Sequence, residues 1–211
     1  MIILSHRGYW KTEKEKNSIT AFERSFSMGF GTETDVRDYK SELVISHDIA
    51  TENCITVDKL FQIYSSYKNP LPLALNIKAD GLQEKLKELL IKYRIENYFV
   101  FDMSIPDGLL YLKQGFKMFS RQSEHEMLPA LYDVIEGIWL DEFHSHWINK
   151  DIMEKHLINN KKLCIVSPEL HKRQYKSEWE DYKYINNNFR ESIMICTDYP
   201  EEARSFFNGQ C

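Results

Sequence analysis

The sequence predicts one α/β domain, residues 1–211, with the architecture of a (β/α)8 barrel. Short apolar runs rich in β-branched and aromatic residues recur along the chain, and the segments between them carry apolar residues at helical spacing. Strands that alternate with helices form a parallel sheet, and eight such units close into a barrel. The 211 residues are compact for this fold, which typically takes about 250.

The predicted strands are the apolar runs. They cover residues 1–4, 32–36, 71–78, 98–102, 117–121, 137–141, 163–167 and 192–196. A further run, 43–46, follows the second strand closely enough to be its hairpin partner. The hairpin strand is therefore expected in addition to the eight strands of the barrel.

The predicted helices fill the intervals between the strands. They cover residues 18–28, 56–64, 81–94, 105–114, 124–135, 147–159, 177–189 and 200–207. Ser18 and Thr56 are of the residue types that cap a helix N-terminus, and Gly29 is of the type that ends a helix. In the third helix, Leu86 and Leu90 belong to one apolar face.

Composition argues against several classes of protein. The net charge is −5 and the charges are interspersed, so no nucleic-acid partner is expected. The cysteines at 54, 164, 196 and 211 form neither a metal-binding spacing nor a disulfide framework, which favours a reducing, cytoplasmic location. Cys164 and Cys196 lie inside apolar runs and are expected in the core. No apolar stretch approaches about 20 residues and no signal peptide is visible, so no stable membrane insertion is expected.

Polar side chains gather at the carboxyl ends of the predicted strands, where barrels of this kind carry their active sites. Glu33 and Asp35 share one face of a strand, and two carboxylates that close together require a proton or a cation; hard divalent ions prefer such oxygen ligands. The strand-end set is His6, Arg7, Glu33, Asp35, His47, Asn76, Lys78, Asp102, Arg121, Asp141, Glu169 and Asp198. This clustering points to an enzyme rather than a passive scaffold.

Four motifs near the N-terminus occur in a specific order and spacing. They are His6-Arg7-Gly8, Lys16-Asn17-Ser18-Ile19-Thr20-Ala21-Phe22, Glu33-Thr34-Asp35-Val36 and Val44-Ile45-Ser46-His47-Asp48. The set resembles the glycerophosphodiester phosphodiesterase superfamily, which also holds the spider-venom-type phospholipases D and, more distantly, the phosphatidylinositol-specific phospholipases C. Two later motifs match that family more loosely, Asn76-Ile77-Lys78 and Thr197-Asp198-Tyr199-Pro200.

The resemblance implies a hydrolase, a metal-dependent phosphodiesterase of the phospholipase-C-like barrel type with a role in lipid metabolism. His6 and His47 would share general acid and base catalysis, for which a pKa of roughly 6.5 suits histidine. Glu33, Asp35 and Asn76 would hold Mg²⁺ or Ca²⁺. Arg7 and Lys78 would bind the phosphate, and Arg121 would bind the anionic part of the substrate or pair with Glu124. The expected partner is a small-molecule phosphodiester.

This chain departs from the family pattern at two places. The third metal ligand of the family is an acid, and here it is Asn76, with Asp141 or Glu169 as conceivable replacements. The family also carries an insertion before the third strand, where this chain has only the 22 residues 49–70, so the substrate pocket must differ. Two alternatives therefore stay open: a barrel that binds a phosphate ligand with weakened turnover, and an unrelated metal-dependent lyase or isomerase acting on a phosphorylated sugar. Of the other histidines, His171 is expected at a loop surface, and His144-x-His146 is a weak metal signal.

Overall fold

The computed structural model describes residues 1–68, 71–186, 189 and 191–209. The chain divides into two compact units. The N-terminal unit is Ser5–Met118, and the C-terminal unit combines Met1–Leu4 with Phe119–Cys211. Strand β1, Ile2–His6, contributes its first residues to the C-terminal unit and its last two to the N-terminal unit.

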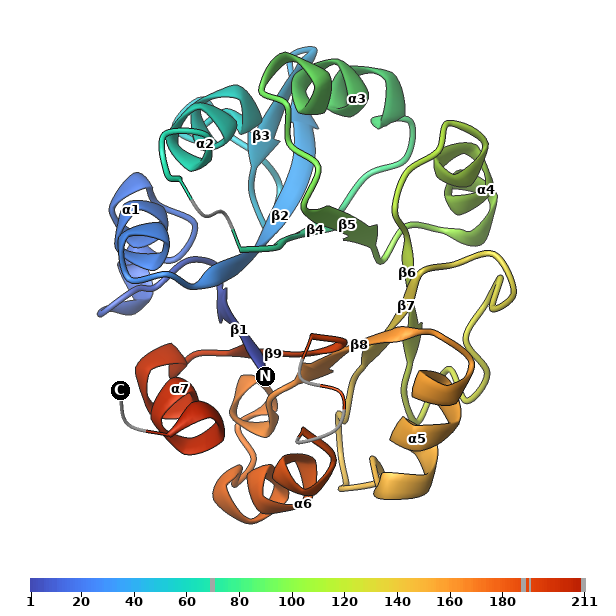
Figure 1. Ribbon diagram of the computed structural model, residues 1–211. Coiled ribbons are helices and arrows are strands. Elements are labelled where there is room, and N and C mark those ends of the chain that lie inside the picture. Colours follow the sequence, from blue (N-terminus) through green and yellow to red (C-terminus); the bar gives the residue numbers. More distant parts are fainter. Residues whose placement is uncertain (69–70, 187–188, 190, 210–211) are drawn as a thin grey trace. The chain divides into compact units, whose positions relative to one another are not determined.

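The N-terminal unit contains a parallel set of strands with helices along one face (Figure 1). After β1 its elements are the short 3-10 helix Glu13–Glu15, α1 (Ile19–Ser27), β2 (Gly31–Tyr39), β3 (Glu42–Ile45), α2 (Val57–Tyr64), β4 (Leu73–Ile77), α3 (Gln83–Lys92), β5 (Tyr98–Phe101) and α4 (Ile105–Lys113). Strand β4 lies between β2 and β5, with parallel pairing on both sides. Strand β3 pairs antiparallel with β2, which confirms the predicted hairpin.

Local sequence signals explain where the first helices begin. The Ser18 hydroxyl accepts a hydrogen bond from the Ala21 amide at 3.3 Å, and the Thr56 hydroxyl accepts one from the Lys59 amide at 3.1 Å. Both predicted N-caps are confirmed, because each side chain satisfies an amide that the first helical turn leaves without a partner. The two helices then pack through the edge-to-face contact of Phe26 with Tyr64, whose ring centroids are 5.3 Å apart.

The C-terminal unit repeats the alternation of strands and helices. Its elements are β6 (Phe119–Gln122), β7 (Gly137–Leu140), α5 (Lys150–Ile158), β8 (Lys162–Val166), the 3-10 helix Pro168–His171, α6 (Lys176–Asn186), β9 (Ile193–Thr197) and α7 (Pro200–Asn208). The parallel order is β9-β8-β7-β6. Cys164 on β8 and Cys196 on β9 are fully buried, as predicted for core residues. Cys211 lies outside the described residues, as do 187 and 188 of the predicted helix 177–189.

One predicted helix is wrong. Residues 124–135 form bends and turns instead of a helix. Pro129 disfavours helical geometry at the residue before it, and Leu131 takes a left-handed conformation with φ of 56°. The predicted helix 147–159 also begins late, at Lys150, because the Asn149 side chain accepts the Ile152 amide at 3.1 Å and caps the helix there.

The order of elements is that of a (β/α)8 barrel. Among the residues that the structure describes, eight strands follow one another, helices separate all but one consecutive pair, and β3 is the additional hairpin strand. Turns replace the helix between β6 and β7. Within the part of the chain that the structure describes, no helix is both long enough and apolar enough to cross a membrane.

Candidate active site

The turn after β1 positions His6 and Arg7. Arg7 and Gly8 both take left-handed backbone conformations, with φ of 58° and 81°. The Arg7 amide donates to the Glu33 carbonyl at 2.9 Å, which ties the turn to β2. A Cβ on residue 8 would lie 2.8 Å from the Cβ of Ala21 and 2.9 Å from its carbonyl carbon, so this close approach to α1 requires glycine.

Strand β2 presents the acidic pair. Glu33 and Asp35 are 2% and 1% exposed. The Arg7 Nε lies 3.2 Å from Asp35 Oδ2, and the Lys78 Nζ lies 3.5 Å from Asp35 Oδ1. The His6 Nε2 lies 4.0 Å from Glu33 Oε2. Two cations and an imidazole therefore surround two buried carboxylates.

Burial and the charge of Asp35 raise the pKa of Glu33 to about 8, although Arg7, Lys78 and the Asn76 amide act in the opposite direction. Burial is the largest cause because a carboxylate that leaves water loses its hydration. At neutral pH this site therefore favours either a proton on Glu33 or an additional positive charge beside it.

Three buried oxygen atoms at this position accept no hydrogen bond from any described residue. They are Glu33 Oε2, Asp35 Oδ1 and Asn76 Oδ1. Asn76 on β4 is the register partner of Asp35 on β2, so the two side chains start from adjacent positions of the sheet. Two carboxylates and an amide carbonyl suit a hard cation such as Mg²⁺ or Ca²⁺. The predicted ligands therefore fit a divalent ion, with two negative charges rather than three.

Asn17 is a site residue that the sequence did not single out. Its Nδ2 donates to Asp35 Oδ2 at 3.0 Å, and its Oδ1 accepts the Thr34 hydroxyl at 2.8 Å. Its φ of 57° is left-handed, a conformation that asparagine tolerates better than most residues. Its place in the second motif was the available signal, but only the fold showed that its side chain reaches Asp35.

His47 pairs with the neighbouring acid, Asp48. It follows β3, its side chain is 46% exposed, and its Nδ1 lies 2.8 Å from Asp48 Oδ1. Its carbonyl accepts a hydrogen bond from Arg37 at 3.2 Å. The structure thus brings together His6, Arg7, Glu33, Asp35, Asn76 and Lys78. The His47 ring, and less strongly Arg7, lower the pKa of Asp48, so the His47–Asp48 pair lies within electrostatic reach of Arg7.

Arg121 belongs to the C-terminal unit. Its Nε lies 3.6 Å from Asp141 and its Nη1 lies 3.7 Å from Glu126. The carboxylate of Glu124, the expected alternative partner, accepts the backbone amides of residues 143, 144 and 145. Burial alone would raise the pKa of Glu124, but these hydrogen bonds lower it to about 2.

The two acids considered as replacements for the third ligand have partners in the C-terminal unit. Asp141 accepts His171 Nε2 at 2.6 Å, so this histidine is half-buried and bonded rather than on the expected loop surface. Glu169 accepts the hydroxyls of Ser167 and Thr197 and the amide of Asp198. Burial raises the pKa of Glu169, and those hydrogen bonds oppose the rise.

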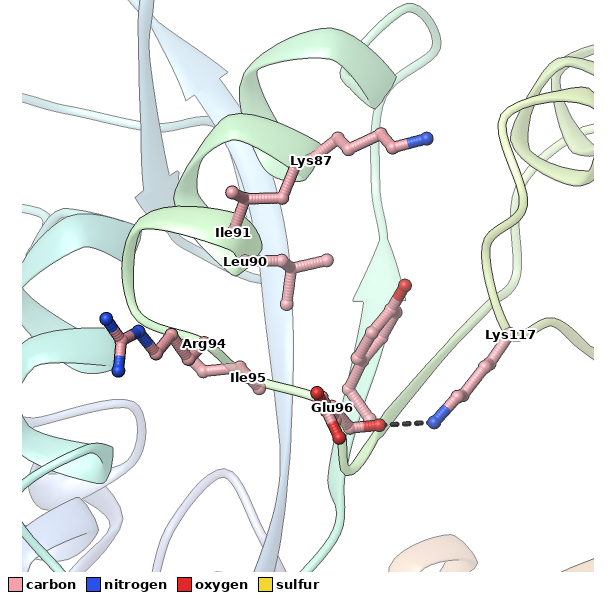
Figure 2. Close-up of a pocket in the computed structure, with 8 residues that line it drawn as sticks. Lys87, Leu90, Ile91, Arg94, Ile95, Glu96 and Lys117 are labelled. Atoms are coloured by element: carbon pink, nitrogen blue, oxygen red, sulfur yellow. Dashed lines mark hydrogen bonds between the residues drawn. The ribbon is translucent and has the colours of Figure 1, made fainter.

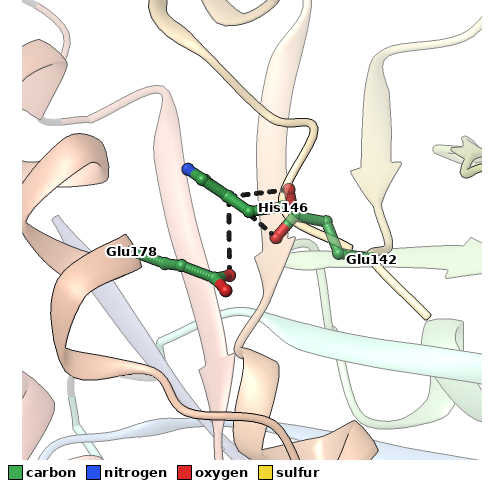
Figure 3. Close-up of side chains that lie close together, drawn as sticks. All are labelled: Glu142, His146 and Glu178. Atoms are coloured by element: carbon green, nitrogen blue, oxygen red, sulfur yellow. Dashed lines mark hydrogen bonds and ion pairs between the residues drawn. The ribbon is translucent and has the colours of Figure 1, made fainter. Parts of the chain in front are cut away.

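A second acidic cluster lies in the C-terminal unit (Figure 3). Glu142, His146 and Glu178 each place a potential metal ligand atom within 4.8 Å of the others. Arg173, however, lies 2.6 Å from Glu178 and 3.5 Å from Glu142, so a cation is already present. Sequence analysis missed this cluster, for which the only signal was an acid four residues before a histidine.

Hydrogen bonds also saturate this second cluster. Glu142 accepts the amides of residues 147 and 148 at 2.7 and 2.6 Å, and the Tyr182 hydroxyl at 2.9 Å. Burial, together with the neighbouring Glu142, raises the pKa of Glu178 to about 7. Unlike the Glu33 site, this cluster leaves none of its carboxylate oxygens without a donor in the described chain. Its geometry is that of a buried, charge-balanced network.

The N-terminal unit also contains a pocket of about 560 Å³ that is separate from the acidic pair (Figure 2). Its lining comes from the end of α3, the following turn, Tyr98 and Lys117. Lys117 donates to the Glu96 carbonyl at its edge. None of the candidate site residues lines this pocket.

No family model matches this sequence, and no curated protein matches it. Solved structures do match. A protein assigned as a glycerophosphodiester phosphodiesterase from Galdieria sulphuraria has a TM-score of 0.78 and 18% identity, over 98% of this chain and 97% of its own. The glycerophosphodiester phosphodiesterase from Agrobacterium tumefaciens has a TM-score of 0.69 and 13% identity, over 99% of this chain and 100% of its own. A phosphodiesterase from Oleispira antarctica, in complex with the product sn-glycerol-3-phosphate, has a TM-score of 0.68 and 13% identity, over 99% and 97%.

These similarities extend over nearly the whole chain, at identities below 20%. They confirm the predicted (β/α)8 fold and the predicted resemblance at the level of fold. Because a fold by itself hosts many chemistries, the reaction must be argued from the site.

Proposed function

We propose that this chain, which has the fold of the glycerophosphodiester phosphodiesterases, is a metal-dependent phosphodiesterase that hydrolyses a small alcohol-phosphate diester. One observation carries the proposal: three buried oxygen atoms of Glu33, Asp35 and Asn76 accept no hydrogen bond from the described residues and lie among basic side chains. Such a set suits a divalent ion that binds a phosphate beside it.

Glu33, Asp35 and Asn76 would hold Mg²⁺ or Ca²⁺. The bound ion would neutralise phosphate oxygens and stabilise the charge that develops in the transition state. Arg7 and Lys78 would orient the same phosphate, since Asp35 holds both cations within 3.5 Å of its carboxylate. An arginine fork suits two phosphate oxygens, and a lysine supplies a point charge.

Two histidines would move the protons. One would remove a proton from the attacking hydroxyl, and the other would protonate the leaving alkoxide. His6 supports this assignment because its Nε2 is 4.0 Å from Glu33 at the edge of the acidic pair. His47 bonds Asp48 through Nδ1, so its Nε2 is the nitrogen that would exchange a proton with the substrate.

The substrate class is a small diester with an alcohol on each side of the phosphate. The Oleispira antarctica phosphodiesterase was solved with sn-glycerol-3-phosphate as its product, which supports an alcohol phosphate as product here as well. The segment 49–70 provides α2 and no further domain-sized insertion, so the chain itself leaves the alcohols unspecified.

³¹P NMR on the purified protein tests the proposal. We expect a new phosphorus resonance from at least one member of a panel of glycerophosphodiesters and lysophospholipids in the presence of Mg²⁺ or Ca²⁺. The signal should vanish with EDTA and in His6→Gln. Its chemical shift distinguishes a cyclic phosphate from an open monoester.

A matched pair of lysine variants controls for general effects of charge. Lys78→Met should lose activity because Lys78 lies 3.5 Å from Asp35, whereas Lys59→Met should not, because Lys59 is exposed on α2. The alternative function is a phosphate-binding barrel without turnover, which the neutral Asn76 favours. Glycerol phosphate binding that depends on Lys78, with no cleavage across the panel, would support that alternative and overturn the enzyme.

A further inference from the structure

Two histidines of the C-terminal unit face each other outside the proposed active site. His125 lies in the segment after β6, and His144 lies in the segment after β7. Their Nε2 atoms are 3.3 Å apart, and their rings are perpendicular within a few degrees, at 85°. Both residues are exposed, and neither has a role in the proposed phosphodiester chemistry.

The separation of the two nitrogens matches a coordination geometry. Imidazole nitrogens bind Zn²⁺ at about 2.0–2.1 Å, so two of them on one tetrahedral ion lie about 3.3 Å apart. The observed separation of 3.3 Å equals the spacing of two such ligands. In the absence of an ion, the same distance accommodates a hydrogen bond between the two rings.

The surrounding segments hold both rings in place before any ion binds. The Glu124 carboxylate accepts the amides of residues 143, 144 and 145, which fixes the segment that carries His144. The Ser123 hydroxyl accepts the amides of His125 and Glu126 at 3.2 Å each. The ring of Phe143 contacts His125 and His144, with centroids 5.6 and 6.3 Å away. Little conformational entropy is therefore left to lose on binding.

We propose that His125 and His144 form a binding site for a transition-metal ion that prefers imidazole, with Zn²⁺ as the representative ion. The two Nε2 atoms supply two ligands, and water completes the coordination. Hard ions such as Mg²⁺ select oxygen ligands and do not compete for this pair. The ion joins the segments that follow β6 and β7 and stabilises their contact.

Binding requires one proton to move. In the metal-free pair one Nε2 carries a proton and donates it to the other. On binding, that ring takes the tautomer with its proton on Nδ1, so each Nε2 offers a lone pair to the ion. No proton is released from the two neutral rings, and no bond within the protein breaks except the hydrogen bond between them.

Calorimetric titration of the intact protein with ZnCl2 tests this site, in a buffer with enough MgCl2 to occupy oxygen ligands. We expect the zinc affinity of the tightest site to fall at least tenfold in His125→Gln and in His144→Gln. His146→Gln is the matched control, because it changes the histidine of the Glu142–His146–Glu178 cluster and should leave that affinity unchanged. Glutamine retains polarity at an exposed position, so both test variants should fold.

Long-range ¹H–¹⁵N NMR of the imidazole rings gives a second readout on the unmodified protein. Zinc should shift the Nε2 resonances of two histidines. One of these resonances should be missing from the spectrum of His125→Gln and the other from that of His144→Gln. Full zinc affinity in both His125→Gln and His144→Gln would overturn the site, and so would loss of that affinity in His146→Gln. A zinc shift confined to other histidines would overturn it in the same way.

Discussion

At the scale of single residues, Asp35 is central to the candidate site because Arg7, Asn17 and Lys78 all contact its carboxylate. Its Oδ2 lies 3.2 Å from Arg7 and 3.0 Å from Asn17. Its Oδ1 lies 3.5 Å from Lys78 and accepts no hydrogen bond from the described part of the chain. One oxygen thus accepts a hydrogen bond from Asn17, whereas the other lies beside the Lys78 ammonium. Asn17 fixes this division, since it bonds both Asp35 and its strand neighbour Thr34.

Asn17→Gly should weaken metal-dependent activity without unfolding the protein. Glycine accepts the φ of 57° but removes both side-chain hydrogen bonds, so Asp35 loses its orientation. Loss of such a supporting residue typically costs about 10- to 100-fold in metal affinity or activity. Calorimetric Mg²⁺ titration and the ³¹P assay measure both quantities.

Asn160→Gly is the matched control for this variant. Asn160 is also an asparagine in the left-handed region, with φ of 59°, but it is exposed in the C-terminal unit. It should leave metal affinity unchanged. Equal metal affinity in the two variants would show that Asn17 does not position Asp35.

Asn76→Glu should bind the divalent ion more tightly. The change adds a third negative charge beside Glu33 and Asp35, and the affinity of oxygen sites for hard cations rises with the number of charged ligands. We expect the Mg²⁺ dissociation constant to fall by at least about tenfold. Asn76→Gln, which matches glutamate in length without its charge, is the control; if it tightens binding as much, charge at position 76 is not the reason.

At the scale of elements, the turn between β1 and α1 depends on one close approach. Gly8 has a φ of 81°, and the Tyr9 amide donates to the Ala21 carbonyl at 2.9 Å. The turn therefore packs against α1 with no space for a side chain at position 8. This contact holds the turn so that the Arg7 amide bonds β2. The segment 124–135, for which the sequence predicts a helix, forms turns instead. There Pro129 and the hydrogen bonds of Glu124 outweigh the apolar spacing that favours a helix.

Gly8→Ala should cost far more stability than Gly29→Ala. Both glycines have positive φ, 81° and 73°, so both variants pay about 1 kcal/mol of backbone strain. Only at position 8 would the new Cβ collide with Ala21, so we expect a total of at least about 3 kcal/mol there. Urea unfolding measures the difference, and equal losses would mean that the contact with Ala21 relaxes freely.

At the scale of the whole molecule, each unit contains buried carboxylates with their own counter-charges. In the N-terminal unit Arg7 and Lys78 accompany Glu33 and Asp35. In the C-terminal unit Arg173 accompanies Glu142 and Glu178. Burial raises the pKa of Glu33 and of Glu178 in the folded chain, so the global stability depends on pH.

Stability should fall as pH rises through the window between the two pKa values of Glu178, which are 4.5 in its ordinary state and about 7 in the fold. The folded state binds more protons than the unfolded chain in that window, so the contribution is complete below pH 4.5 and is lost above about pH 7. Denaturant unfolding at several pH values should show this loss in the unmodified protein and a reduced loss in Glu178→Gln.

Glu180→Gln controls for the removal of one carboxyl group from α6, since Glu180 is exposed. It should retain the pH dependence of the unmodified protein. A pH dependence unaltered in Glu178→Gln would show that Glu33, whose pKa burial raises to about 8, carries it instead.

The alternation of elements could be read from the sequence because it rests on local physics. Apolar runs marked the strands, and Ser18 and Thr56 marked helix starts whose hydrogen bonds the structure contains. The exact ends of the helices were harder to predict. In α5, for example, the Asn149 cap rather than the apolar pattern sets the first residue. The turns in residues 124–135 could not be predicted for a similar reason. The amides that Glu124 accepts lie about 20 residues further along the chain, beyond any local pattern.

By itself the sequence determined the fold class and the identity of the groups at the strand ends, because both follow from residue type and from the period of two along a strand. Only the tertiary structure decided which of those groups meet. In the structure, Asp35 contacts Asn17 and Lys78. Asp141 accepts a hydrogen bond from His171, and His47 pairs with Asp48. Contacts of that kind depend on strand register and on backbone geometry such as the left-handed turn at Arg7 and Gly8, which no local pattern of residues encodes.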